Sequence, residues 1–295
     1  MTKVIEDPEY KYLRLEPIPT EEEVAIFYAK EFYDANQSYF NNSSLVVQQE
    51  QSDFFNSRWE NVFQTCKARF DGKISDKKVF DIGFGFAQAL LFLKDKGLEV
   101  SGLDPSIDAY NYALSKGINA FHAGIENFDC VGDNKYDIVL LMNVLEHLRK
   151  PVETVVNIKN QLLNPNGILV IEVPNDFNVF QEVANAEYGL NQWWVNSPNH
   201  INYFSASSLR KVLEESGYEV FEHEASFPLE MFLLFGDQYV GNGDIGRESH
   251  NKRVNFEMLL RKHGKNKELK AFYKSLADLN LGRTITIYAT PKNEK

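Results

Sequence analysis

The feature that most constrains the fold is a regular alternation of short apolar runs with helical segments from residue 78 onward. The runs are "KVFDIG", "LEVSGLD", "INAFHAG", "YDIVLLMN" and "GILVIEVP", and each is typical of a buried strand. Segments such as "LLFLKDKG" and "SIDAYNYALSKG" have helical spacing and separate these runs. Strands joined by helices form a parallel sheet that binds ligands at the carboxyl ends of its strands. We therefore predict an α/β protein with a doubly wound, mostly parallel, Rossmann-like sheet.

Three regions follow from this pattern. Residues 76–228 and 282–295 form the predicted core, which includes a helix with Ser205 at its N-cap and a last strand, "RTITIYATP". Residues 1–75 are predicted to form an aromatic-rich helical cap, with a helix that begins at a capping box of Thr20 and Glu23. Residues 229–281 are predicted to be a helical insertion that acts as a lid, with "GDQYVGNGDIGRESH" as a mobile surface loop.

Composition excludes several classes of function. A formal charge of −11 argues against a broad nucleic-acid-binding face. No apolar run approaches the roughly 20 residues that span a bilayer, and the N-terminus lacks a signal-peptide pattern, so we expect a cytoplasmic protein without a membrane span. Cys66 and Cys130 do not have metal-ligand spacing, so we expect reduced thiols and no bound metal. We expect either a monomer or a homodimer.

The loop "DIGFGFA" follows the first core strand and carries the strongest chemical signal. Gly83 and Gly85 let the backbone approach a ligand closely, and Asp104 ends the next strand where it could accept hydrogen bonds from ribose hydroxyls. A dinucleotide-binding loop has a third glycine where this chain has Gln88. Asp81 would repel a pyrophosphate but hold the ammonium of an amino acid. This combination favours a cationic adenosyl amino acid over NAD.

These segments resemble the class I S-adenosylmethionine-dependent methyltransferases. "DIGFGFA", "GLDPS", "AGIENF", "YDIVLLMNVLEHL" and "LLNPNGILVIEVPN" occur in the order of that family's motifs, and "NVLEH" is similar to ubiquinone-pathway O-methyltransferases. Weaker similarity after residue 174 points toward bacterial methyltransferases that modify sugars, surface glycans or natural products. The resemblance implies S-adenosyl-L-methionine as cofactor. The implied cofactor-binding residues are Asp81, Gly83, Gly85, Asp104, Pro105, Ile125, Glu126, Met142 and Asn143.

A second cluster of candidate residues is "QWWVNSPNHINYF", which follows the fifth core strand. Tryptophan rings can stack on a sugar or heteroaromatic face, and asparagine or histidine can fix hydroxyl groups. The candidate substrate residues are Trp193, Trp194, Asn199, Asn202 and Tyr203. An aromatic cap over the sheet edge is the alternative for the two tryptophans. We expect the other histidines, His122, His223, His250 and His263, to be structural or solvated.

The predicted reaction is metal-independent O-methylation of a small polar acceptor, such as a sugar, a nucleotide-linked sugar or a natural-product intermediate. We expect His200 to be the general base and His147 to position the acceptor. N-methylation of an amino sugar and a non-catalytic adenosyl-binding scaffold are the alternatives. An NAD-dependent oxidoreductase is disfavoured by Asp81 and Gln88.

Overall fold

The computed structural model describes residues 2–27 and 51–292. The strands are β1 (Lys3–Glu6), β2 (Leu13–Glu16), β3 (Lys78–Ile82), β4 (Glu99–Asp104), β5 (Asn119–His122), β6 (Tyr136–Met142), β7 (Leu163–Pro174), β8 (Asn202–Tyr203), β9 (Tyr218–Ala225) and β10 (Thr284–Pro291). The helices are α1 (Glu21–Phe27), α4 (Ser52–Arg69), α5 (Gln88–Asp95), α6 (Ile107–Ser115), α7 (Pro151–Asn157), α8 (Val179–Tyr188), α9 (Ala206–Glu215), α10 (Glu230–Leu234), α11 (Gly243–Lys262) and α12 (Asn266–Asp278). Two short 3-10 helices are η2 (Asp129–Val131) and η3 (Leu145–His147), and η4 (Ile158–Leu162) is a short π-helix.

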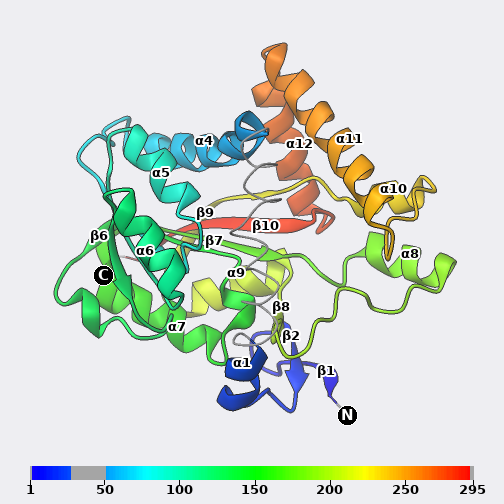
Figure 1. Ribbon diagram of the computed structural model, residues 1–295, viewed down its shortest axis with the longest axis horizontal. Coiled ribbons are helices and arrows are strands. Elements are labelled where there is room, and N and C mark those ends of the chain that lie inside the picture. Colours follow the sequence, from blue (N-terminus) through cyan, green and yellow to red (C-terminus); the bar gives the residue numbers. More distant parts are fainter. Residues whose placement is uncertain (1, 28–50, 293–295) are drawn as a thin grey trace.

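A seven-stranded sheet forms the centre of the molecule, in the order β5-β4-β3-β6-β7-β10-β9 (Figure 1). β3, β4, β5, β6 and β7 run parallel, and β10 runs antiparallel to both of its neighbours. The strand order reverses between β3 and β6, which is where open α/β sheets bind ligands. The predicted Rossmann-like fold is confirmed.

Alternating side chains of the strands build two hydrophobic clusters, one on each face of the sheet. Val79 and Ile138 pack with α4, α5 and α6, whereas Phe80 and Val139 pack with α7 and α9. Because strands covered on both faces need apolar residues at every position, β3 and β6 are apolar runs rather than alternating ones.

The predicted helical cap over residues 1–75 is wrong at its start. β1 and β2 form an antiparallel hairpin, and β2 pairs with β8 through Leu13 and Tyr203. The third strand of this small sheet lies about 190 residues later in the chain, so local sequence patterns carry no signal for it. The capping box is present: the backbone N–H of Glu23 donates to Oγ1 of Thr20, and the backbone N–H of Thr20 donates to Oε2 of Glu23. The rest of the predicted helix after α1 lies outside the described residues.

The insertion between β9 and β10 contains α10, α11 and α12. The predicted loop over residues 236–250 is wrong in its second half, because α11 begins at Gly243. The side chain of Asn242 accepts hydrogen bonds from the N–H groups of Asp244 and Ile245 and so caps the helix. Leu269 and Leu276 of α12 belong to the hydrophobic core, so α12 is part of the core rather than a detachable lid.

Candidate active site

A first cavity of about 170 Å³ lies at the carboxyl ends of β3 and β6. Four predicted cofactor residues line it together: Asp81, Gly83, Met142 and Asn143. The remaining lining residues come from α4, the glycine loop and the start of α5, and are Arg58, Trp59, Phe84, Phe86, Gln88 and Ala89. The folded chain therefore brings the first and fourth predicted motifs to one place.

The glycine loop above this cavity depends on two different constraints. Gly83 and Gly85 have φ angles of +73° and +51°, which favour glycine. A Cβ added at Gly83 would also lie 2.8 Å from Cγ2 of Val144 and 3.2 Å from Cδ1 of Ile125, whereas Gly85 has open space. The N–H of Gly85 donates to Oδ2 of Asp104 at 2.8 Å. This hydrogen bond fixes the loop against the end of β4.

Two carboxylates, Asp81 and Asp104, are buried beside the glycine loop. Burial, and then the charge of Asp104, raises the pKa of Asp81 to about 8, although Arg58 opposes the shift. Burial also raises the pKa of Asp104, against the hydrogen bonds that it accepts from the N–H groups of Ser106 and Gly85. A cation bound beside Asp81 would relieve the repulsion between the two carboxylates.

The other predicted cofactor residues lie outside the lining of the first cavity: Gly85, Asp104, Pro105, Ile125 and Glu126. The carbonyl of Pro105 is hydrogen-bonded to Nε2 of His122 at 2.9 Å. Glu126 is exposed and accepts a hydrogen bond from Oγ1 of Thr154 at 3.3 Å. Direct contact of these five residues with a ligand stays a prediction.

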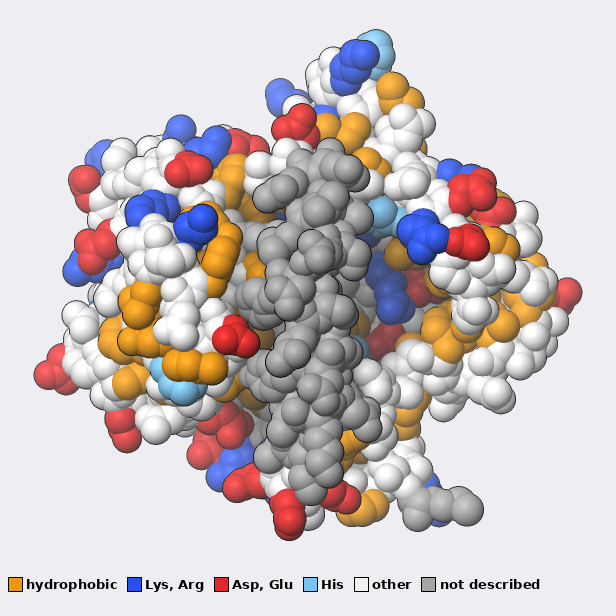
Figure 2. All heavy atoms as spheres, in the orientation of Figure 1, with side chains coloured by type: hydrophobic (Ala, Val, Ile, Leu, Met, Phe, Trp, Pro, Cys, Tyr) orange, Lys and Arg blue, Asp and Glu red, His pale blue; other side chains and the backbone are white. Residues whose placement is uncertain are grey.

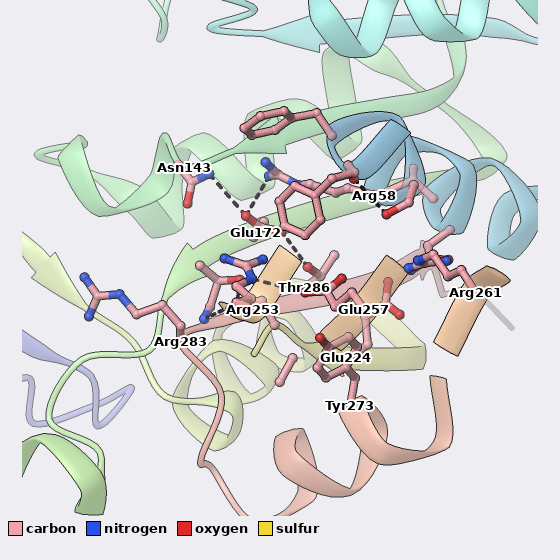
Figure 3. A pocket seen from close by; sticks show the side chains of 18 of the residues that line it. Arg58, Asn143, Glu172, Glu224, Arg253, Glu257, Arg261, Tyr273, Arg283 and Thr286 are labelled. Atoms are coloured by element: carbon pink, nitrogen blue, oxygen red, sulfur yellow. Dashed lines mark hydrogen bonds and ion pairs between the residues drawn. The ribbon is translucent and has the colours of Figure 1, made fainter. Parts of the chain in front are cut away.

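A second cavity, of about 280 Å³, adjoins the first and shares Arg58 and Asn143 with it. Its lining comes from α4, β7, β9, β10, α11 and α12 and includes many charged and polar side chains: Arg58, Asn143, Glu172, Glu224, His250, Arg253, Glu257, Arg261, Tyr273, Arg283 and Thr286 (Figure 3). In Figure 2, basic and acidic side chains gather in a hollow to the right of the centre of the view. Ligand pockets are usually mostly apolar, so this lining suits a polar ligand.

Glu172 of β7 lies at the junction of the two cavities. Its Oε1 accepts hydrogen bonds from Nη2 of Arg58 at 2.6 Å and from Nδ2 of Asn143 at 3.2 Å. Its Oε2 accepts one from Oγ1 of Thr286 at 2.9 Å. Neither Glu172 nor Arg58 was predicted from the sequence as a site residue. The signal was present, because a glutamate inside the apolar run "ILVIEVP" must have partners when the strand is buried.

His147 and His200 lie together, with ring centroids 4.9 Å apart, but neither lines one of the two cavities. Nδ1 of His147 is hydrogen-bonded to the carbonyl of Asn199 at 2.9 Å. Burial, above all, lowers the pKa of each ring to about 4, so both imidazoles are neutral at pH 7. The backbone of Asn143 is hydrogen-bonded to His147, and the charge of Arg283 acts on His200. The pair therefore lies near two residues that line the second cavity, Asn143 and Arg283.

Within the described part of the chain, one group of side chains could hold a metal ion: Glu146, His147 and His200. Their ligand atoms all lie within 4.8 Å of one another, and Glu146 is buried. Two neutral imidazoles and a carboxylate are suitable ligands for a divalent transition metal. Spacing alone did not reveal this set, because 53 positions separate His147 from His200.

Most of the predicted substrate segment packs inside the protein. Trp194 and Tyr203 are buried, and the ring of Phe177 contacts both at centroid distances of 5.4 Å. Nδ2 of Asn202 donates to the carbonyl of Leu148 at 2.7 Å. None of the five predicted substrate residues, Trp193, Trp194, Asn199, Asn202 and Tyr203, lines either cavity. Trp194 thus packs against Phe177, Asn202 has a structural hydrogen bond, and a substrate role for the five residues stays a prediction. In contrast His250, expected to be structural or solvated, lines the second cavity.

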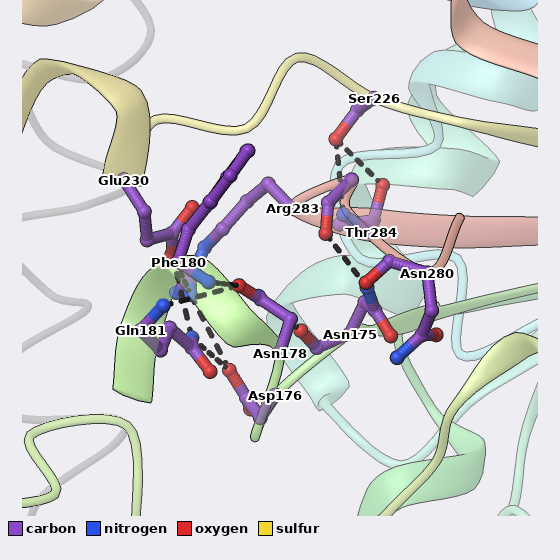
Figure 4. Close-up of polar contacts among 11 residues, drawn as sticks. Asn175, Asp176, Asn178, Phe180, Gln181, Ser226, Glu230, Asn280, Arg283 and Thr284 are labelled. Atoms are coloured by element: carbon purple, nitrogen blue, oxygen red, sulfur yellow. Dashed lines mark hydrogen bonds and ion pairs between the residues drawn. The ribbon is translucent and has the colours of Figure 1, made fainter. Parts of the chain in front are cut away.

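Arg283 anchors the edge of the second cavity to a buried polar network (Figure 4). Its Nη1 lies 2.9 Å from Oε1 of Glu230 and 3.3 Å from Oδ1 of Asp176. Nε2 of Gln181 donates to the same two carboxylates. This network ties α8 and α10 to the start of β10 at the side of the site.

The family described as methyltransferase domain matches residues 57–223, more than half of the chain. The matched range contains Arg58 and Asn143, which line both cavities, and the whole glycine loop. The chain belongs to the class I S-adenosylmethionine-dependent methyltransferases. The predicted family, enzyme class and cofactor are thereby confirmed.

Curated relatives of this methyltransferase include ubiquinone biosynthesis O-methyltransferases. The protein of that name from Rickettsia bellii is 27% identical over 171 residues, which cover 55% of this chain and 69% of the relative. The one from Aromatoleum aromaticum is 27% identical over 157 residues and covers 50% of this chain and 67% of the relative.

Solved structures share the fold of this methyltransferase at low identity. A SAM-dependent methyltransferase from Archaeoglobus fulgidus superposes with a TM-score of 0.52 at 18% identity, covering 84% of this chain and all of that one. The 1,6-didemethyltoxoflavin-N1-methyltransferase of Burkholderia thailandensis, with bound S-adenosylhomocysteine, gives 0.53 at 12% identity and covers 99% of both chains. Among the described residues of this methyltransferase, no helix has the length and apolarity needed to cross a bilayer.

The residues of the first cavity fit S-adenosylmethionine. A buried carboxylate at Asp81 matches its ammonium group, because a positive partner lowers the cost of ionising that side chain. Gly83 contributes only backbone atoms to the lining of the cavity. Met142 and Asn143 complete this wall of the cavity.

Proposed function

We propose that this methyltransferase transfers a methyl group to an oxygen of a small polar acceptor held in the second cavity. A sugar, a nucleotide-linked sugar or a natural-product intermediate would have the required polarity. The observation that carries the proposal is that two cavities adjoin and share Arg58 and Asn143. A donor in the first cavity and an acceptor in the second would then meet at these two side chains.

S-adenosylmethionine, when bound, supplies an electrophilic methyl group on a sulfonium ion. In this proposal Asp81 holds the ammonium group, Asp104 accepts hydrogen bonds from ribose hydroxyls, and Met142 and Asn143 border the methionine end. The chain contributes chiefly alignment of the two reactants and exclusion of water. Glu172 supports this alignment because it fixes Arg58 and Asn143 relative to each other.

One observation favours oxygen as the atom that accepts the methyl group, and another favours a polar acceptor molecule. The curated relatives carry the name O-methyltransferase, which supports oxygen. The many charged residues around the second cavity disfavour a wholly apolar acceptor, because they would lose hydration without gaining partners.

The acceptor proton would pass to His200, with His147 as a positioning residue. Both rings are neutral at pH 7, and since neither lines a cavity, this step requires a water between the acceptor hydroxyl and the ring of His200. Since the pKa of His200 is about 4, the rate with saturating donor should rise with pH through about 4 and stay level from pH 6 to 8. Substitution of a true general base by alanine lowers turnover by about a hundred- to ten-thousandfold.

The direct test is transfer of a tritiated methyl group from S-adenosylmethionine into a panel of acceptors. The panel contains sugars, nucleotide-linked sugars and their amino counterparts, and mass spectrometry identifies the methylated atom. We expect label on a hydroxyl oxygen and loss of transfer in His200→Ala. Label on nitrogen would replace the proposal by N-methylation, and donor binding without transfer to any of these acceptors would favour a non-catalytic scaffold.

A further inference from the structure

The second cavity concentrates positive charge in a strongly acidic protein. The chain has a formal charge of −11, yet four arginines line this one cavity: Arg58, Arg253, Arg261 and Arg283. Three carboxylates accompany them: Glu172, Glu224 and Glu257. The charge that a ligand meets depends on which of these groups neutralise one another.

Two of the arginines are paired inside the cavity, and a third is paired outside it. Nη2 of Arg58 lies 2.6 Å from Oε1 of Glu172, and Nε of Arg253 lies 3.1 Å from Oε1 of Glu257. Arg283 forms its ion pairs with the network of Figure 4, whose carboxylates do not line the cavity. In Figure 3 its guanidinium accordingly points away from the other labelled side chains.

Arg261 is left without a carboxylate within the described part of the chain. Its Nη1 donates to Oδ1 of Asn266 at 3.5 Å, and its Nε is buried without a hydrogen-bond partner there. The remaining carboxyl group, Glu224, forms no ion pair with Arg261. Its Oε1 instead accepts a hydrogen bond from the hydroxyl of Tyr288 at 2.8 Å. The cavity therefore retains excess positive charge at Arg261.

The geometry of α11 brings this charge to one side of the cavity. Arg253, Glu257 and Arg261 are spaced by four residues, so they share one face of the helix. Figure 3 shows Arg261 and Asn143 on opposite sides of the cavity. Asn143 marks the side shared with the first cavity.

We propose that the second cavity recognises an anionic group of the acceptor, a carboxylate or a phosphate, through Arg261 and Arg253. The methylated atom of the same molecule lies at the opposite side, next to Arg58 and Asn143. Guanidinium groups suit this role because they offer several donors in the geometry of carboxylate and phosphate oxygens. The inference rests on the proposed function, since it assigns the second cavity to the acceptor, and it narrows the acceptor to molecules that carry such a group.

The test titrates inorganic phosphate and, separately, acetate into the full-length protein at constant ionic strength, with and without saturating S-adenosylhomocysteine. We expect phosphate or acetate to bind with a dissociation constant of about 1–10 mM. Arg261→Gln and Arg253→Gln should each weaken binding about tenfold or more, and Arg261→Lys should weaken it less. Tighter binding of phosphate assigns a phosphate-bearing acceptor, and tighter binding of acetate assigns a carboxylate.

Arg247→Gln is the matched control, because Arg247 lies on the same helix, is exposed, and pairs with Asp244 outside the cavity. It should leave anion binding unchanged. The proposal is overturned if neither anion binds, or if the cavity variants and the control behave alike. Failure of S-adenosylhomocysteine to bind would instead contradict the proposed function, and the anion titrations of the unliganded protein would still be decisive for the anion site.

A second measurement covers the case in which a cavity variant does not fold. Phenylglyoxal modifies accessible arginines, and mass spectrometry of the wild-type protein reports the rate at each site. Phosphate or acetate should slow modification of Arg253 and Arg261 and leave Arg247 unaffected. Equal rates with and without both anions would contradict the proposal.

Discussion

Glu172 shows how one buried residue can organise both cavities of this enzyme. It lies near the end of β7, in the apolar run "ILVIEVP", and its carboxylate accepts hydrogen bonds from Arg58, Asn143 and Thr286. Arg58 and Asn143 are the two residues that the cavities share. A change at Glu172 should therefore affect folding stability as well as the alignment of donor and acceptor.

Glu172→Gln keeps the size of the side chain but removes its charge. We expect the free energy of unfolding to fall by about 1–2 kcal/mol, because the charged partner of the Arg58 guanidinium is lost. The loss is limited because Arg58 is partly exposed and water can replace part of the interaction. Urea denaturation measures this change. Glu153→Gln is the control, since Glu153 is exposed and pairs only with Lys150, and it should change stability by less than about 0.5 kcal/mol. Equal effects of the two substitutions would remove Glu172 from its structural role.

We expect cofactor binding to depend on pH through Asp81. Its pKa of about 8 in the free protein should fall when the ammonium of the ligand binds beside it. At pH 6.5 the free side chain is mostly protonated, so binding of S-adenosylhomocysteine should release close to one proton. Affinity should then increase as pH rises from 6 toward 8, by at most about tenfold per pH unit.

Calorimetry at pH 6.5 in two buffers of different ionisation enthalpy measures this proton release. The ammonium of the ligand stays protonated at that pH and does not confuse the result. Asp81→Asn should bind more weakly and release almost no proton. Equal proton release by the variant and the wild type would show that another group titrates.

The parallel strands and their glycine loop could be predicted from the sequence, because each depends on residues within about 10 positions. β3, β4, β6 and β7 are all apolar runs, and Gly83 has both a positive φ and a tight contact that require glycine. The β1–β2 hairpin was not predicted. The third strand of its sheet, β8, lies far away in the sequence, so local patterns give no sign of it. The start of α11 was missed because Gly243 and Gly246 suggested a loop, whereas the cap at Asn242 begins a helix.

The start of α11 provides a test at the level of this element. Because residues 243–250 are helical, their amides should exchange more slowly than those of residues 236–241 in the unliganded protein. If α10 and α11 act as a lid, S-adenosylhomocysteine together with phosphate should slow exchange further in residues 236–250. Hydrogen exchange with mass spectrometry follows both effects. Equal rates in the two segments would contradict the helix, and no response to ligands would contradict the lid.

Across the whole molecule, the site combines segments that local sequence patterns treat separately. Arg58 comes from α4, Glu172 from β7 and Arg261 from α11, and the sheet and its insertion bring them around one cavity. Part of the first cavity could be anticipated from the sequence, because its predicted residues lie at the ends of two apolar runs, β3 and β6. The second could not, because its charged residues are single positions in distant helices and strands. In the predicted aromatic segment after β7, Trp194 and Tyr203 are buried, whereas the polar side chains of the second cavity include Arg253, Glu257 and Arg261 of α11.

The residues of the first cavity fit an adenosyl amino acid better than a dinucleotide. Calorimetric titration of the full chain with S-adenosylhomocysteine and with NAD measures this preference. We expect micromolar affinity for S-adenosylhomocysteine, no measurable heat with NAD, and about ten- to a hundredfold weaker binding of S-adenosylhomocysteine by Asp104→Ala. Binding of NAD at similar strength, or no binding of S-adenosylhomocysteine, would contradict the account.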